Sequence, residues 1–282
     1  MRRQGKKHQM SNSINTNVGA MVALSALRIS QSNLSNESKV VQTGYRVADA
    51  LDNASTFSVA QGIRGNLQAF RAVQASLANG LSLAEVTRAA LERMTDVVNN
   101  IRTKAIQLAD PSVDGAARTI YWIDFGQVAD QIPRYINQAN FNSVNLLSAG
   151  STTRTFLADA SANQLSLTGQ SSVWTAWTTF QANVNVNDAA LAAGSLGVVD
   201  TLGRAITTAM AAVAGEARQL RLQVGYVNDI TDANTAGLGA IVDGDIGKAA
   251  AAVQAEQVRQ QLYVNAVSIA NAQPSAMLGF LR

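Results

Sequence analysis

The residues best placed to do chemistry in this sequence are two small groups of acidic side chains. Asp243 and Asp245 lie in the segment VDGDIG, where a pair of carboxylates could hold calcium or act as an acid–base pair. The spacing and the closing glutamate of an EF-hand loop are absent, so a solvated turn between helices is the simpler interpretation. Asp49, Asp52 and Asn53 form a similar polar cluster, but no histidine or cysteine lies nearby to complete a metal site.

Few residues in this sequence could support nucleophilic catalysis. The chain has no cysteine and a single histidine, His8, so a Cys–His pair is excluded and a Ser–His pair nearly so. The segment GIRG at 62–65 has no preceding strand and is not expected to bind phosphate. Trp122, Trp174 and Trp177 could stack on a sugar ring, but packing against neighbouring segments is the simpler role. The sequence therefore predicts a protein that is not an enzyme and holds no cofactor or metal.

The positive net charge of +3 has a single source near the start of the chain. The sequence carries 22 Lys and Arg against 19 Asp and Glu, and Arg2, Arg3, Lys6 and Lys7 contribute to that excess. Without these four cations, no basic excess remains to form a phosphate-binding face. Nucleic-acid binding would depend on residues 1–9 alone, and none is predicted.

Membrane and secretion signals are also missing from the sequence pattern. No run of about 18 apolar residues is visible, so we expect no membrane insertion. The basic segment at the start is not followed by an apolar run of about seven to fifteen residues, so we expect no cleaved signal peptide.

The dominant pattern is a heptad of apolar residues, and the helices that it predicts would position the other residues of the chain. One long register, with a second set interleaved three residues on, contains Leu77, Ala84, Leu91, Val98 and Ala105, then Met94, Ile101 and Leu108. A shorter register nearer the start contains Ala20, Leu27, Leu34 and Val41. The register in the other half contains Val199, Ile206, Val213, Leu220, Val227 and Ile241. Such a period predicts supercoiled helices, and a helix of some forty-five residues would be roughly 65–70 Å long, too long for a compact domain.

The rest of the chain predicts shorter elements. The spacing over 125–139 indicates a helix, which Pro133 should kink or split. Polar and apolar residues alternate over 164–168, and 174–180 is rich in strand formers, so we expect a small β-hairpin in this region. In the last helix, Ile246, Ala250 and Val253 line one stripe, which Val258, Leu262, Ala266 and Ile269 continue after a small shift. Pro274 is expected to end it.

The fold class predicted from these patterns is mostly α. The chain should fold back on itself, so that its N- and C-terminal helices form an elongated antiparallel coiled-coil rod with a small β-hairpin region in the middle of the chain. The terminal helices carry apolar stripes that need a partner, because tertiary packing supplies most of the stability of a helix. We therefore expect these ends to become ordered on assembly.

Six blocks of residues, in the same order, resemble bacterial flagellins. INTNVGAMVALSALRISQSNL at 14–34 is similar to the family's amino-terminal I-N-T-N-x-x-A signature, and TGYRVADALDNAS at 43–55 to S-G-x-R-I-N-S-A-x-D-D-A-A. ANGLSLAEV at 78–86 resembles N-D-G-I-S-L-A, and NFNSVNLLSAG at 140–150 resembles T-F-N-G-x-x-L-L. IVDGDIGKAAAAVQAEQVRQQL is similar to I-E-D-A-D-Y-A-x-E, and SIANAQPSAMLGFLR to the closing A-N-Q-x-P-x-x-x-L-x-L-L.

The resemblance implies a structural subunit of short type that polymerises into the extracellular flagellar filament for swimming. It implies inner-tube helices at 10–45 and 244–282, a rod domain from 46–149 and 188–243, and a short outer β-hairpin region at 150–187. The residues expected to assemble the inner tube are Ile14, Val18, Leu27, Leu34, Val41, Val253, Val258, Leu262, Ile269 and Leu278. Those expected in the heptad core of the rod are Leu77, Leu91, Val98, Ile101, Val199, Ile206, Val213, Leu220 and Val227.

The implied partners are further copies of the chain, other flagellins, the type III export apparatus with an export chaperone, and the hook–filament junction and cap proteins. Three alternatives stay open on the sequence alone. They are a flagellin-like hook–filament junction protein, an intramolecular helical bundle without an assembly role, and a basic nucleic-acid-binding coiled coil.

Two segments depart from the family pattern. A motif that docks a host Toll-like receptor, Q-R-[IV]-R-E-L-A-V-Q, aligns with 99–107, where Arg102 matches but Asn100 and Lys104 replace an Arg and a Leu. We expect weak or absent receptor activation. Residues 1–9 have no counterpart in the pattern, which begins near Met10, and we interpret them as a disordered upstream extension.

Overall fold

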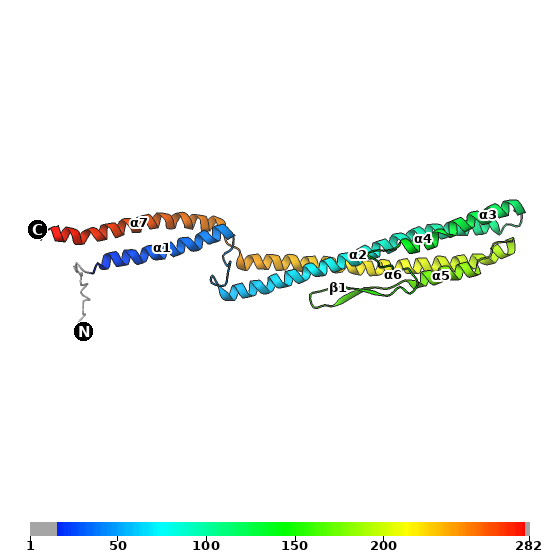
Figure 1. The fold of residues 1–282 in the computed structure, drawn as a ribbon, viewed down its shortest axis with the longest axis horizontal. Coiled ribbons are helices and arrows are strands. Elements are labelled where there is room, and N and C mark those ends of the chain that lie inside the picture. Colours follow the sequence, from blue (N-terminus) through cyan, green and yellow to red (C-terminus); the bar gives the residue numbers. More distant parts are fainter. Residues whose placement is uncertain (1–15, 280–282) are drawn as a thin grey trace, which may run out of the picture. The chain divides into compact units, whose positions relative to one another are not determined.

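A computed structural model of the protein describes residues 16–279, and the side chains among them up to residue 272 (Figure 1). Seven helices and one two-stranded antiparallel sheet make up the regular structure of this part of the chain, which confirms the predicted mostly-α class with a small hairpin. The chain divides into two compact units. The first joins the chain up to Arg64 with the residues from Thr235 onward, and the second comprises Gly65–Asn234. Ile14 and residues 1–9 lie outside the described residues.

The first unit is built on two helices that run side by side, α1 (Val18–Thr43) and α7 (Ile246–Gly279) (Figure 1). Asn17 caps the start of α1, since its side-chain oxygen accepts a hydrogen bond from the amide of Ala20 at 2.9 Å. Gly44 ends α1 in the left-handed conformation, at φ +74°, where glycine is favoured. The helix α7 continues past Pro274 to Gly279, so the prediction that it ends at this proline is wrong.

The turn after α1 packs against the turn before α7. The amides of Arg46 and Val47 both donate to the carbonyl of Val242, at 2.8 and 3.2 Å. Val47, Ala60 and Val242 form a small buried core there. Gly244 must be glycine, because a Cβ at this position would lie 2.5 Å from Val40 Cγ1 and 3.2 Å from the amide nitrogen of Arg46.

The second unit has its core between two long helices, α2 (Ala54–Leu108) and α6 (Ala189–Val242), which also extend into the first unit. The nine heptad residues predicted for the rod core are all buried, namely Leu77, Leu91, Val98, Ile101, Val199, Ile206, Val213, Leu220 and Val227. Gln74 bonds Asn228 and Arg102 lies 3.4 Å from Asp200, so the two helices are antiparallel. The period of the sequence thus corresponds to a real packing seam.

Arg118 stabilises the turn at the end of α2 through hydrogen bonds to its backbone. Its guanidinium donates to the carbonyls of Leu108, Asp110 and Val113, which have no helical partner of their own. The chain then continues into α3 (Gly115–Ala129) and α4 (Gln131–Gln138). The expected interruption near Pro133 is present but falls at Asp130, because a proline is tolerated in the first turn of a helix, where its missing amide has no partner.

The hairpin consists of β1 (Arg154–Leu157) and β2 (Gln164–Leu167), which confirms the strand predicted from the alternation over 164–168. The prediction of strands over 174–180 is wrong, because these residues belong to α5 (Ser171–Asn183). Val173, Trp177 and Phe180 are spaced four and three apart and are buried together. Burial of that helical face outweighs the strand preference of threonine and tryptophan.

One helix of the described residues, α6, is long and apolar enough over an 18-residue window, of mean hydropathy 1.3, to pass a test for a membrane span. This differs from the expectation that the sequence holds no such segment. The core helix of a soluble protein passes the same test, but such a helix is mostly buried, whereas 28% of this window is buried. The apolar heptad face of α6, which is buried in the second unit, accounts for part of this composition.

Candidate assembly surface

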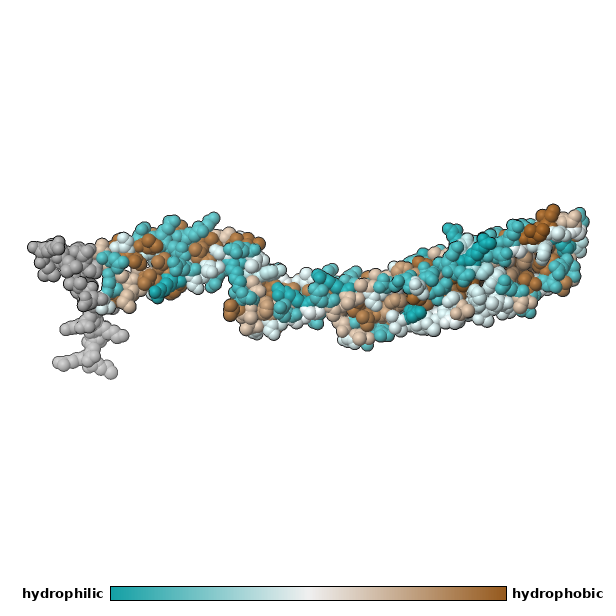
Figure 2. All heavy atoms as spheres, viewed as in Figure 1, coloured by the Kyte–Doolittle hydropathy of each residue, from teal (hydrophilic) through white to brown (hydrophobic). Residues whose placement is uncertain are grey.

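The paired helices α1 and α7 leave many large apolar side chains uncovered. On α1 these are Val18, Met21, Val22, Leu24 and Ile29, and on α7 they are Ile246, Val258, Leu262, Val264 and Ile269. The exposed fraction ranges from 41% at Leu24 to 68% at Ile269. Figure 2 shows the corresponding apolar surface among polar atoms on this helix pair. Apolar area of this kind on a soluble chain marks an interaction site.

The seam between the two helices uses a different face of each. On α7 the buried and half-buried positions follow spacings of four and three, at Ala249, Val253, Glu256, Gln260, Tyr263, Val267 and Ala270. On α1 the matching positions are Ala20, Ala23, Leu27, Ser30, Leu34 and Glu37. This is the heptad spacing of a coiled-coil pair. The two helices therefore contact each other along one narrow seam, and the rest of the circumference of each helix stays uncovered.

Val258, Leu262 and Ile269 form a second apolar stripe on α7, which we call the outer stripe. At 100° per residue these positions lie on nearly the opposite side of α7 from its seam. They are 56%, 59% and 68% exposed. The small shift in the sequence pattern after Val253 is thus a change of face, and the expectation that one stripe runs along the whole helix is wrong.

The predicted inner-tube residues divide between these two faces. Leu27, Leu34 and Val253 are half-buried in the α1–α7 seam, and Val41 lies at its edge with 37% of its surface exposed. The outer stripe and Val18 are free of the seam. Ile14 and the side chain of Leu278 lie outside what the structure describes. The first group holds the two helices together, whereas the second is available to a partner.

A polar layer interrupts the apolar seam near its middle. Ser30 Oγ donates to Glu256 Oε2 at 2.6 Å, and Arg259 Nη1 donates to Glu256 Oε1 at 2.6 Å. Ser30 and Glu256 are only 2% and 5% exposed. The hydrogen bond from Ser30 is the largest influence on the pKa of the Glu256 carboxyl and lowers it below its ordinary value. The hydrogen bond from Arg259 lowers this pKa further, whereas burial raises it.

Apolar patterning missed this layer because it treats polar residues as surface positions. The signal was nevertheless present, since Ser30 falls three residues after Leu27 and Glu256 three after Val253, where a heptad expects an apolar residue. A polar pair inside such a seam favours one register, because any slip would leave a buried charge without its partner.

Comparison with known proteins places this chain in a family. A family model described as the bacterial flagellin N-terminal helical region matches residues 14–152. Flagellin FljK of Caulobacter vibrioides is 31% identical over 271 residues, which cover 96% of this chain and 99% of that protein. The chain belongs to the flagellin family. A flagellin of Brucella melitensis is 28% identical and covers 96% of this chain and 99% of its own length.

Flagellins are structural subunits of the bacterial flagellar filament, and the membership confirms the function predicted from the six sequence blocks. A solved structure assigned as a flagellar hook-associated protein of Vibrio parahaemolyticus is also similar, with a TM-score of 0.60 and 15% identity. The likeness covers 68% of this chain and 100% of that one. At this identity it shows a shared fold and does not favour a junction role.

The receptor-motif positions of this flagellin lie on α2 in the second unit. Asn100 is exposed, Arg102 Nη1 lies 3.4 Å from Asp200 of α6, and Lys104 forms an ion pair with Asp124 of α3. Two of the three positions therefore make ionic contacts within the subunit itself.

Three of the four aspartates that the sequence singles out, Asp49, Asp52 and Asp245, have structural partners. Lys39 Nζ bonds Asp49 Oδ2 and Asp52 Oδ1, each at 2.7 Å. These bonds raise the pKa of Lys39 and lower those of Asp49 and Asp52. Asp245 Oδ1 caps α7 by accepting from the amide of Lys248 at 2.9 Å. Across the described residues no cluster of His, Cys, Asp and Glu is arranged to hold a metal ion.

Proposed function

We propose that this flagellin polymerises through the uncovered apolar faces of α1 and α7, and that the outer stripe makes the decisive contact. The observation that carries the proposal is the exposure of Val258, Leu262 and Ile269 on the side of α7 that faces away from α1. Burial of one such side chain contributes about 1.5–3 kcal/mol. A helix pair with uncovered stripes can recover that free energy by packing against the equivalent pairs of neighbouring subunits.

The domain boundaries inferred from the sequence fit this proposal. The helices at 10–45 and 244–282 would form the inner tube, and the parts at 46–149 and 188–243 would form the surrounding rod layer. The segment at 150–187, which contains the hairpin, would be the outer region. The small number of buried residues in α1 and α7 supports an inner role, because helices with so little packing of their own gain most from assembly.

The route by which the subunit is exported and the proteins that it contacts are part of the same proposal. A filament subunit must reach the extracellular end of a growing polymer, so we infer passage through the flagellar type III export apparatus with an export chaperone. Contacts with junction and cap proteins at the ends of the filament, and with other flagellins within it, follow from the same role.

The test is polymerisation of the purified protein, followed by sedimentation and electron microscopy. The unsubstituted protein should form long uniform filaments, and Leu262→Glu should not. The matched control is Gln261→Glu, which adds the same charge at a neighbouring exposed polar position. Filaments of normal length and yield from Leu262→Glu would refute the proposed role of the outer stripe.

A further inference from the structure

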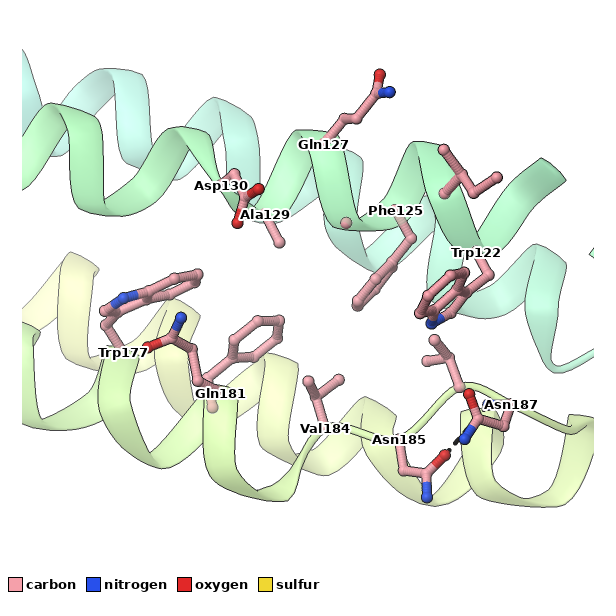
Figure 3. A pocket seen from close by; sticks show the side chains of 14 residues that line it. Trp122, Phe125, Gln127, Ala129, Asp130, Trp177, Gln181, Val184, Asn185 and Asn187 are labelled. Carbon is pink, nitrogen blue, oxygen red and sulfur yellow. Dashed lines mark hydrogen bonds between the residues drawn. The ribbon is translucent and has the colours of Figure 1, made fainter. Parts of the chain in front are cut away.

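The second unit contains a groove between α3 and α5, with a volume of about 620 Å³. Its walls are aromatic and are formed by Trp122, Phe125, Trp177 and Phe180. In Figure 3, Trp122 and Phe125 face the gap from α3, and Trp177 faces it from α5. We call this hollow the tryptophan groove. Small-molecule sites in proteins usually have volumes of about 300–1,000 Å³, so the groove is large enough to be one.

The aromatic side chains of the groove fall into two classes. Trp177 stacks on Phe180 with ring centroids 5.3 Å apart, and Phe125 stacks on the same ring at 6.2 Å. These three side chains are at most 4% exposed, so packing within the subunit accounts for them. Trp122 is 50% exposed and belongs to none of the ring pairs or cation–π contacts of the described residues. Its indole therefore offers an uncovered apolar face to the groove.

The rim of the groove is polar and nearly uncharged. Gln127, Gln181 and Asn187 are exposed there, and their side chains make no hydrogen bond within residues 16–272. Among the lining residues that the structure describes, Asp130 alone is charged, and its carboxylate has no ion-pair partner in this part of the chain. The rim therefore presents several hydrogen-bonding groups to a ligand and no cation to attract a phosphate or carboxylate.

The groove adjoins a second, smaller hollow at Trp122. Trp122, Val186 and Asn187 line both hollows, and the second has a volume of about 370 Å³. Arg118 also lines the second hollow, but its guanidinium donates to three backbone carbonyls at the end of α2. An elongated ligand can therefore lie across the indole with one part in each hollow.

We propose that the tryptophan groove binds a neutral oligosaccharide, with one sugar ring stacked on Trp122 and its hydroxyls bonded to Gln127, Gln181 and Asp130. A pyranose ring has an apolar face of C–H groups that packs on an aromatic ring, and its hydroxyls both donate and accept hydrogen bonds. Amide side chains also donate and accept, and a carboxylate accepts. The inference goes beyond polymerisation, because the groove lies in the second unit and uses no residue of the outer stripe.

Other classes of ligand match the lining less well. A purely apolar peptide or hydrocarbon would cover Gln127, Gln181 and Asp130 without bonding them, and burial of an unbonded polar group costs free energy. An anionic ligand would be repelled by the Asp130 carboxylate and would find no cation in the groove. A neutral polyol with one apolar face satisfies both the indole and the rim.

The test is a titration of the full-length monomer with neutral trisaccharides, followed by saturation-transfer NMR of the sugar protons. The probes are cellotriose, chitotriose and maltotriose, and a phosphorylated glucose is the anionic comparison. We expect a trisaccharide to bind with a Kd of roughly 0.1–5 mM, and the phosphorylated sugar to bind at least about tenfold more weakly. Absence of saturation transfer to all three trisaccharides at roughly 10 mM would overturn the inference.

Matched variants locate the binding in the groove. Trp122→Ala should raise the Kd roughly tenfold, whereas Trp122→Phe keeps an aromatic face and should raise it less. Gln181→Ala and Asp130→Ala should each raise the Kd about two- to tenfold. The control is Trp174→Phe, since Trp174 does not line the groove, and its Kd should be unchanged. Equal affinity of Trp122→Ala and the unsubstituted protein, with both folded by circular dichroism, would overturn the inference.

The NMR signal also reports how the sugar lies. Stacking on Trp122 predicts that the protons on one face of a sugar ring receive most of the saturation. Equal transfer to all ring protons would overturn the stacked arrangement. Binding of the neutral dye N-phenyl-naphthylamine without binding of any trisaccharide would show an apolar docking surface instead, and would also overturn the inference.

The sugar site and the proposed function fail in different experiments. Leu262→Glu should bind the trisaccharide normally, because Leu262 lies in the first unit. Trp122→Ala should polymerise as the unsubstituted protein does. Filaments without sugar binding would overturn this inference alone, and sugar binding without filaments would overturn the proposed function alone.

Discussion

The side chain of Asn17 links the start of α1 to the carbonyl of Ala270 on α7, with Nδ2 donating to the oxygen at 2.7 Å. In an uninterrupted helix that carbonyl would accept from the amide four residues later, but residue 274 is Pro274 and has no N–H. Asn17 therefore does two things, since its Oδ1 also caps α1 through the amide of Ala20. The proline in α7 is matched by a donor from the other helix.

This double role predicts different effects for two substitutions of Asn17. Asn17→Asp keeps an oxygen that can cap α1 but loses the donor to Ala270, whereas Asn17→Ala loses both. We expect Asn17→Ala to weaken the helix pair by about 1 kcal/mol more than Asn17→Asp, from loss of the cap. Amide hydrogen exchange in α1 and α7 would measure the difference.

Proline 274 provides the control for that comparison. Pro274→Ala supplies the missing N–H to Ala270, so the bond from Asn17 becomes redundant. In this background, Asn17→Asp should have a clearly smaller effect on exchange than in the unsubstituted chain. An effect of equal size in both backgrounds would contradict the link between Asn17 and the proline.

The alignment of α1 with α7 can be tested by a designed disulfide. A Cβ built on Gly19 lies 3.9 Å from the Cβ of Ala270, within the range of about 3.5–4.5 Å that disulfides need. The variant G19C/A270C should therefore oxidise readily to a single intramolecular bond, detected by gel mobility and mass. In the control variant, G19C/A266C, the second cysteine sits one turn away and should oxidise much more slowly. Equal rates for the two variants would refute this alignment.

The buried carboxylate of Glu256 predicts that acid weakens the helix pair. Because the pKa of Glu256 is lowered in the folded chain, its contribution is present above the ordinary glutamate pKa of about 4.3 and is lost as pH falls through the lower folded value. The thermal midpoint of α1–α7 unfolding should therefore drop as pH falls from about 5 to 3.

The matched variant for the acid effect is Glu256→Gln, which can still accept a hydrogen bond from Ser30 but does not titrate. Its thermal midpoint should fall less over the same pH range than that of the unsubstituted chain, and the remainder should come from Asp49 and Asp52, whose pKa values are also lowered. Identical pH dependence in the two proteins would exclude Glu256 as a source.

The two faces of the helix pair predict different consequences for Leu262 and Leu27. Leucine 262 is 59% exposed, so Leu262→Glu should block filament growth and leave the melting of the monomer nearly unchanged. Leucine 27 is half-buried in the seam, so Leu27→Glu should impair both. Sedimentation and thermal melting of each variant would separate the two effects. Normal swimming of cells that carry only Leu262→Glu would be incompatible with the proposal.

The receptor-motif positions predict weak recognition by the host Toll-like receptor. Asn100 and Lys104 differ from the Arg and Leu of the receptor motif that aligns with this segment, and Lys104 forms an ion pair with Asp124. A cell reporter assay should show little response to nanomolar protein. The double variant N100R/K104L should increase the response, and strong activation by the unsubstituted protein would contradict the prediction.

Much of the fold could be predicted from the sequence, because the apolar residues of a packed helix recur at a characteristic spacing. The heptads at Leu77–Ile101 and Val199–Val227 correspond to the buried seam of the second unit. The prediction of strands at 174–180 is wrong because strand propensity amounts to only about 1 kcal/mol. Burial of Trp177 and Phe180 on one helical face contributes more than that. Trp122 could not be placed either, since packing and exposure of an aromatic residue look alike in sequence.

The sequence by itself determined the family, the helical period and the absence of cysteine chemistry. The tertiary structure decided which face of each helix is covered. A period fixes how side chains are spaced around a helix, but only the position of the neighbouring helix determines which of them it buries. That is why Val253 and Val258, five residues apart in one amphipathic pattern, end on different faces of α7, one in the seam with α1 and one exposed to a partner.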